Sequence, residues 1–256
     1  MNNRGKRVDR RTSVWMFLVG GIAAGLALPL SLGAQSRPAG SMELMRGWWP
    51  DALRSRMTPQ GAVRVSTVWK KPGWTPAGEK PIHVCWERLP DSTPEQRALV
   101  RDAVAGTWAS YGMVSFVGWD ACNAGDRGIR IGIVRSNSHT MHLGSGLDGV
   151  PDGMQLQMDF SGADECEHRN DFCVRATAVH EFGHALALTH EQNRPDAPAW
   201  CRSEFAETEW WAIPDSNITT YDPQSIMNYC NAHWNNEGLL SARDIETVGV
   251  LYGARR

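Results

Sequence analysis

The stretch HEFGHALALTHE, residues 180–191, holds side chains whose types and spacing suit metal chemistry. His180 and His184 are four residues apart, so on a helix they share one face and can present two imidazole nitrogens to one ion. Glu181 follows about 100° round the helix, where a base for a metal-activated water belongs. His190 can join them only if the helix ends and the chain turns back. Three protein ligands and one open position describe a catalytic zinc site.

The plainer interpretation of this stretch is a buried amphipathic helix whose histidines are satisfied within the protein. HExxH fixes only three identities in five residues and is weak evidence by itself. The further histidine at position 190 favours the metal site.

A second motif, Ser225-Ile226-Met227-Asn228-Tyr229, lies downstream. With it, residues 180–190 resemble the HExxHxxGxxH signature of the metzincin zinc endopeptidases, whose Met-turn lies beneath the metal. The similarity is closest to the astacins, in which Glu follows the third histidine, as Glu191 does here, and the turn reads Ser-x-Met-x-Tyr. Tyr221-Asp222-Pro223 also fits that group. The resemblance covers roughly residues 81–256.

The resemblance implies an α+β fold of two subdomains. The upper one, residues 81–190, would hold a twisted, mostly parallel sheet with an antiparallel edge strand and two long helices above the cleft. The lower one, residues 191–256, would be small and irregular and would end in a C-terminal helix. An extended peptide substrate would add to the edge strand, which residues 139–153 lead into.

The same resemblance implies a secreted endopeptidase with one Zn²⁺ held by His180, His184 and His190. Glu181 would be the general base for the attacking water. Tyr229 matches the astacin tyrosine that contacts zinc in the resting enzyme and then stabilises the oxyanion. The alternative for Tyr229 is a packed turn residue. Met227 would form an apolar floor and is not a ligand.

One position departs from the family pattern. The glycine between the second and third histidines is Ala187 here. A positive φ at alanine costs about 1 kcal/mol, so the sequence predicts a strained but intact turn.

Two other functions remain open. One is a zinc amidase that acts on cell-wall peptides. The other is a catalytically silent, zinc-bearing binding module, although such proteins usually lose the glutamate that is present here as Glu181.

The N-terminus differs in composition from the rest. Residues 1–34 combine a basic head with an apolar run that ends in small residues, which is typical of a signal peptide. An uncleaved membrane anchor and export by a twin-arginine route are the alternatives. Residues 35–80 are rich in Pro, Gly and Trp and would be a propeptide, a linker or an N-terminal arm. No cysteine precedes Cys85, which excludes latency through a cysteine on the zinc.

The net charge of the chain limits the classes of partner it can bind. Residues 1–34 hold five Lys or Arg and one Asp, so their removal changes the formal net charge from −2 to −6. An acidic chain is a poor ligand for nucleic acid or anionic membranes. We therefore expect a secreted, periplasmic or extracellular monomer with a protein or peptide substrate, and membrane contact only if the N-terminal segment is retained.

Six cysteines in an exported chain indicate three disulfides, although six allow 15 connectivities. Cys166 with Cys173 would clamp the loop before the zinc helix, and Cys201 with Cys230 would tie the segment after His190 to the Met-turn. Cys85 and Cys122 would then pair. The six positions are Cys85, Cys122, Cys166, Cys173, Cys201 and Cys230.

Regular patterns begin at Pro81. Strands are expected at residues 82–86, 114–119, 129–134 and 154–160 from their β-branched and aromatic content. Thr93-Pro94-Glu95-Gln96 is a capping box that begins a helix of about 18 residues. Ser241 caps a last helix closed by Gly253. Residues 204–213 would shape one wall of the cleft, with Trp210 and Trp211 as core residues or, alternatively, as a substrate subsite.

Other polar residues lack metal-ligand spacing. Asp148, Asp152 and Asp159 match no calcium loop and are expected to form turns. Five further histidines are expected to be surface or core residues rather than a second zinc site: His83, His139, His142, His168 and His233.

Overall fold

The computed structural model describes residues 62–75, 78–163, 166–206, 214–216 and 218–255, which all belong to one compact unit. Its strands are β1 (Lys80–Trp86), β2 (Val114–Ala121), β3 (Ile129–Val134), β4 (His139–Thr140) and β5 (Met154–Gln157). Its α-helices are α3 (Pro94–Gly106), α4 (Trp108–Tyr111), α5 (Asn170–Ala185), α6 (Ala199–Phe205) and α7 (Ala242–Tyr252). Short 3₁₀ helices lie at η1 (Val65–Thr67), η2 (Leu89–Asp91), η3 (Gly144–Leu147), η5 (Glu191–Asn193) and η6 (Trp234–Gly238). Two predictions lie outside the described residues: the signal segment 1–34, and the place of Trp210 and Trp211 in the cleft wall.

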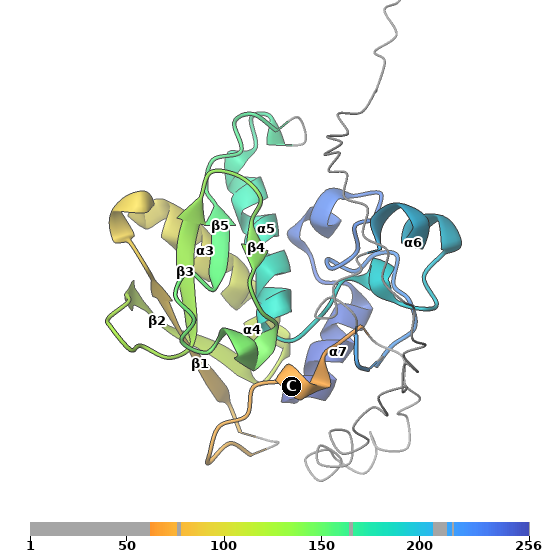
Figure 1. The fold of residues 1–256 in the computed structure, drawn as a ribbon, viewed down its shortest axis with the longest axis horizontal. Helices are drawn as coiled ribbons and strands as arrows, with labels where there is room; N and C mark the ends of the chain where they lie inside the picture. The colour runs from red at the N-terminus through yellow and green to blue at the C-terminus, as the bar shows by residue number, and fades with distance from the viewer. Residues whose placement is uncertain (1–61, 76–77, 164–165, 207–213, 217, 256) are drawn as a thin grey trace, which may run out of the picture. The chain divides into compact units, whose positions relative to one another are not determined.

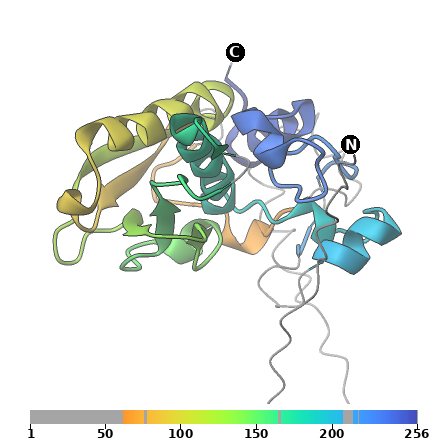
Figure 2. The same ribbon diagram turned by 90° about the horizontal axis from the view of Figure 1, so that it is seen from above.

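The sheet has the order β2-β1-β3-β5-β4. All neighbouring strands are parallel except β4 and β5, which are antiparallel. Helices α3 and α5 cover one face of this sheet (Figures 1 and 2). The core strands β1 and β3 bury one apolar face, on which Ile82, Val84, Ile129 and Ile131 are fully buried, while residues such as His83 and Arg130 lie on the opposite face. The α+β prediction, with its antiparallel edge strand, is confirmed.

The first long helix differs from the prediction. The expected capping box forms, with Gln96 N donating to Thr93 Oγ1. The helix breaks at Thr107 instead of running on to Tyr111. Two local causes are present: Gly106 is a poor helix former, and the Thr107 hydroxyl donates to the carbonyl of Ala103 at 2.7 Å. The predicted single helix of about 18 residues is therefore wrong.

Strand β5 is shorter than predicted. It ends at Gln157, because the side-chain amide of Asn170 pairs with the backbone that follows. Asn170 Oδ1 accepts from Phe160 N at 2.7 Å, and Nδ2 donates to Met158 O at 3.1 Å. Residues 158–160 therefore leave the sheet and lead toward α5.

The core extends N-terminal to Pro81. Val63, Val65, Val68 and Trp69 are buried in the same apolar cluster as the sheet. Val63 bridges to Leu188 and Ser216. Residues 62–69, which we call the N-terminal arm, therefore pack against the chain near the histidine motif.

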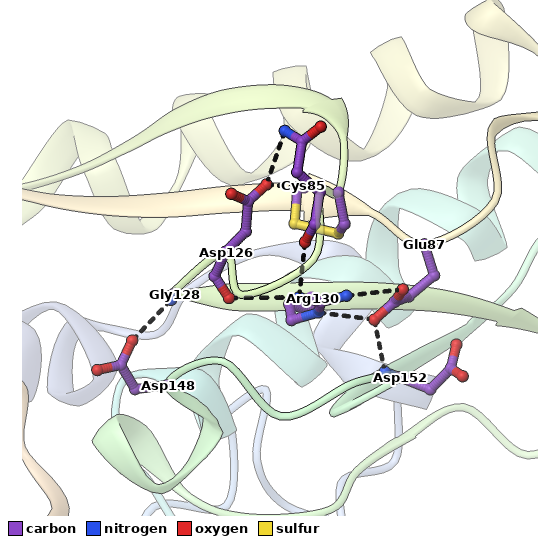
Figure 3. Close-up of a disulfide and its surroundings, with 9 residues drawn as sticks. Cys85, Glu87, Asp126, Gly128, Arg130, Asp148 and Asp152 are labelled. Atoms are coloured by element: carbon purple, nitrogen blue, oxygen red, sulfur yellow. Dashed lines mark hydrogen bonds and ion pairs between the residues drawn. A yellow bond between two sulfur atoms is a disulfide. The ribbon is translucent and has the colours of Figure 1, made fainter.

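All three predicted disulfides form: Cys85–Cys122, Cys166–Cys173 and Cys201–Cys230. Figure 3 shows the first of these beside Arg130, a nearly buried residue of β3 that forms two hydrogen bonds to the Glu87 carboxylate at 2.8 and 3.1 Å. The disulfide thus joins the carboxyl ends of β1 and β2, and the ion pair joins the carboxyl end of β1 to the amino end of β3.

The part after His190 contains little regular structure. Among the described residues there, the helices are η5, α6, η6 and α7. Helix α7 begins with the predicted Ser241 cap, whose hydroxyl accepts from Asp244 N at 3.0 Å. None of the helices in the described residues is long and apolar enough to cross a membrane.

Candidate active site

Helix α5 carries the first two histidines through the interior. From Cys173 onward most of its residues are buried on every side, so His180, Glu181 and His184 lie in the protein rather than on its surface. Gly183 lies close against the Met-turn, since an added Cβ would meet Met227 Sδ at 2.5 Å and would displace that side chain. The Met-turn therefore lies directly against the ligand-bearing helix, as predicted for Met227.

The bend before the third histidine lies where the sequence requires it. Helix α5 ends at Ala185, and Ala187 takes a φ of 74°. Leu188 N donates to Gly183 O at 3.1 Å, and Ala187 N donates to His184 O at 2.9 Å. This bonding is that of a Schellman motif, whose left-handed position normally holds glycine. Ala187 accepts about 1 kcal/mol of strain there.

The bend brings three imidazoles together. His190 Nε2 lies 3.1 Å from His180 Nε2 and 3.0 Å from His184 Nε2. These three residues are the one group among the described residues that could hold a metal ion, and all three are buried. Two nitrogen ligands of a tetrahedral zinc site are about 3.3 Å apart, given Zn–N bonds of about 2.0–2.1 Å. The cluster thus fits one zinc ion.

The proton positions also fit a metal. His180 Nδ1 lies 2.8 Å from the carbonyl oxygen of Ile226, and His184 Nδ1 lies 2.9 Å from that of Leu188. A carbonyl only accepts, so each Nδ1 donates, and each neutral ring directs an Nε2 lone pair toward the cluster. Burial, with the neighbouring His190 and His180, holds the pKa of His184 well below its usual range. Neutral imidazole is the form that binds metal.

Glu181 is buried beside the cluster. Burial raises the pKa of its carboxyl group to about 8. Its Oε2 atom has no hydrogen-bond partner among the described residues. Because a buried, unsatisfied carboxylate oxygen is costly, a ligand or water that carries a proton is the natural partner of this atom.

Tyr229 lies over the histidines. Its ring centroid is 4.2 Å from that of His190 and 5.6 Å from that of His180, nearly parallel to the latter. The side chain is 48% exposed. Tyr229 therefore combines contact with the cluster and access to solvent, which a fully packed turn residue would lack.

Two residues that sequence reasoning missed hold the Met-turn. Asp244 accepts from Ser225 Oγ at 2.7 Å and from Ile226 N at 3.0 Å, which fixes the carbonyl that His180 contacts. Gln192 Oε1 accepts from Tyr229 N at 3.1 Å. Ser-x-x-Asp at 241–244 is a capping box, so a sequence signal existed for Asp244; none existed for Gln192.

Glu191 joins the third histidine to this network. Its backbone N donates to Met227 O at 3.0 Å, and its Oε2 accepts from Asp222 N at 2.8 Å. Burial raises the pKa of its carboxyl group to about 8, against the effect of the nearby Arg194.

The remaining polar candidates do not join a metal cluster. Asp148 accepts from Gly128 N, Asp159 accepts from Ser161 N, and Asp152 pairs with Arg88. Among the described residues none of the five other histidines belongs to a metal-binding group. Asp148 and Asp152 lie in turns, as expected, and the bond of Asp159 to Ser161 N is a local one of the kind found in turns.

Comparison with known proteins finds similarity to proteases. No protein-family model matches the chain. Blastula protease 10 of Paracentrotus lividus is 28% identical over 153 residues, which covers 46% of this chain. The chain spans only 26% of the length of that relative.

Two solved structures share the fold. Myroilysin aligns with a TM-score of 0.51 at 23% identity and covers 77% of this chain and 100% of its own. High choriolytic enzyme 1, a hatching enzyme zinc-protease from Oryzias latipes, aligns with a TM-score of 0.50 at 20% identity, with the same coverage of both chains. The similarity that the two motifs indicated is thereby confirmed: the chain has the fold of the astacin-like metzincins and carries their three-histidine motif.

Proposed function

We propose that this chain is a zinc-dependent endopeptidase that hydrolyses peptide bonds of protein or peptide substrates. The observation that carries the proposal is the buried convergence of His180, His184 and His190, on a helix that also supplies Glu181. When bound, zinc would supply a Lewis acid that polarises the scissile carbonyl and makes water easier to deprotonate.

The chain's own groups would then do the following. The three histidines hold the ion through Nε2 atoms. Glu181 accepts a proton from the attacking water and later donates it to the leaving amine. The Tyr229 hydroxyl donates a hydrogen bond to the oxyanion of the tetrahedral intermediate. Its exposed ring beside His190 supports this role.

The proposal includes an export route and a division of the chain. Three disulfides support folding in an oxidising compartment, reached with residues 1–34 as the signal. The catalytic unit, a monomer, would include the N-terminal arm, because the arm's apolar residues are buried with the sheet.

A diverse peptide library, incubated with the purified chain and read by mass spectrometry, tests this function. We expect internal peptide bonds to be cut, and the cutting to stop with a zinc chelator and resume when zinc is added. A parallel incubation with peptidoglycan tests the amidase alternative. Cleavage of cell-wall peptides alone would contradict the proposal, and zinc binding without cleavage of either substrate would favour the binding module.

A further inference from the structure

We propose that Trp69 is a positioning residue for the histidine cluster. Its indole fastens the end of helix α5 and so holds the bend that returns His190 to His180 and His184. The inference rests on the proposed zinc site, but the contacts that support it lie outside the ligands themselves.

The last carbonyl groups of a helix have no partner within it. Beyond the two bonds of the Schellman motif, the carbonyls of Ala185, Leu186 and Ala187 need donors from elsewhere. All three residues are fully buried, so solvent water cannot donate hydrogen bonds to these carbonyls. The end of α5 therefore depends on other segments of the chain.

The N-terminal arm supplies two of these donors. Trp69 Nε1 donates to Ala185 O at 2.7 Å, and Arg64 N donates to Ala187 O at 2.8 Å. The third donor is the hydroxyl of Tyr252 on α7, 3.3 Å from Leu186 O. Tyr252 also accepts from Trp69 N at 3.4 Å. The Trp69 indole makes the shortest of these bonds, and it is a side-chain bond that a substitution can remove.

The arm also holds the chain beyond the bend. Thr189 N donates to Ala62 O at 2.8 Å, next to the third histidine. The carbonyl of Thr67 lies against Gly144, where an added Cβ would meet the Thr67 oxygen at 2.0 Å and the Ala187 Cβ at 3.0 Å. The bend is thus enclosed by the arm on one side and by η3 on the other.

Ala187 explains why the bend needs this support. Glycine would adopt its φ of 74° without penalty, whereas alanine disfavours it. When the Trp69 donor is absent, the Ala185 carbonyl is left buried without that partner, and the strained turn can relax by moving His190. Substitutions of groups that orient metal ligands typically weaken metal affinity about 10- to 100-fold.

The test compares Trp69→Phe with Trp108→Phe in the full-length chain. Trp108 is a matched control, since it is fully buried and its Nε1 donates at 2.7 Å to Val179 O in the middle of the same helix. We expect Trp69→Phe to weaken zinc binding about tenfold in competition with a chelator and to alter the visible spectrum of the cobalt-substituted protein. Trp108→Phe should leave the zinc affinity within about twofold of the wild-type value and the cobalt spectrum unchanged.

A metal-independent measurement separates this inference from the proposed function. In the zinc-free chain, amide hydrogen exchange at Ala187 and Leu188 should be about tenfold faster in Trp69→Phe than in Trp108→Phe. If the wild type binds no zinc, the proposed function fails. The exchange comparison still tests whether Trp69 holds the end of helix α5. Should Trp69→Phe fail to fold, 3-benzothienylalanine at position 69 replaces the indole N–H by sulfur at nearly the same volume.

A second substitution that relieves the strain at Ala187 provides the decisive test. Adding Ala187→Gly to Trp69→Phe should restore zinc affinity to within about twofold of the wild type, because glycine needs no external hold at that φ. Equal zinc affinity and equal exchange in the two tryptophan variants would overturn the inference. So would a double variant that binds zinc no better than Trp69→Phe.

Discussion

The two parts of the molecule on either side of His190 are stabilised by different means. The upper part, from β1 to the end of α5, buries apolar strands such as β1 and β3 against α3 and α5. The lower part buries charged and polar groups that bond one another, as Arg194 does with Asp196 and with Thr219 O. The upper part is held mainly by apolar packing, and the lower part mainly by hydrogen bonds between buried polar groups.

This difference bears on how each part serves the site. The upper helix fixes His180, Glu181 and His184 along one rigid rod. The lower part fixes Ile226 and Tyr229 through the side chains of Asp244 and Gln192. We therefore expect substitutions of the side chains on helix α5 to act on the chemistry directly, and those of Asp244 and Gln192 to act through the placement of the Met-turn.

The largest expected effect is that of Glu181→Gln. Loss of the base should lower kcat by about 100- to 10,000-fold while zinc content stays at the wild-type value, because Glu181 is not a ligand. Steady-state kinetics on denatured casein, with metal analysis of the same sample, measure both. A variant that digested casein at the wild-type rate would show that the base is elsewhere.

Tyr229→Phe probes the contribution of the lower part to the chemistry. Removing one oxyanion donor should reduce kcat by about 100-fold with little change in KM. The split between kcat and KM for a fluorogenic peptide decides the outcome. If KM alone rose, Tyr229 would be a substrate-binding residue and not a donor to the transition state.

Asp244→Asn breaks the polar network beneath the site. It leaves donors from Ser225, Ile226 and Ser241 without a carboxylate, so the free energy of unfolding should fall by about 2 kcal/mol. Urea denaturation measures this loss. The matched control in the upper part is Asp148→Asn, a more exposed carboxylate, for which we expect less than about 1 kcal/mol. Equal losses would remove the distinction between the two parts.

Ile131→Val gives the smallest effect and tests the apolar side of the comparison. Ile131 is fully buried in β3. Removal of one methylene should cost about 1 kcal/mol of stability and leave kcat unchanged. A lowered kcat in a correctly folded variant would mean that the upper core, like the lower network, tunes the site.

Much of the upper part could be predicted from the sequence, because local patterns encode it. The Thr93 capping box, the β-branched strands and the four-residue spacing of His180 and His184 each lie within one short segment. The break at Thr107 was missed, since periodicity continues across it. Its two causes, Gly106 and the Thr107 hydroxyl bonded to Ala103, leave no mark on the apolar pattern.

The lower part could be predicted only in part. The family resemblance indicated the Met-turn, and the number and positions of the cysteines indicated the disulfide between Cys201 and Cys230. The bonds of Asp244 to Ser225 and of Glu191 to Asp222 join residues 19 and 31 positions apart. Such pairs follow no period, so only a three-dimensional structure shows them.

Zinc content is the most direct measure of the central claim, that three imidazoles on either side of a strained bend hold one ion. Elemental analysis of the purified wild-type chain should find one zinc per chain, and His190→Ala should lose it under the same dialysis. Absence of stoichiometric zinc in the wild type, or full retention of zinc by His190→Ala, would contradict the account.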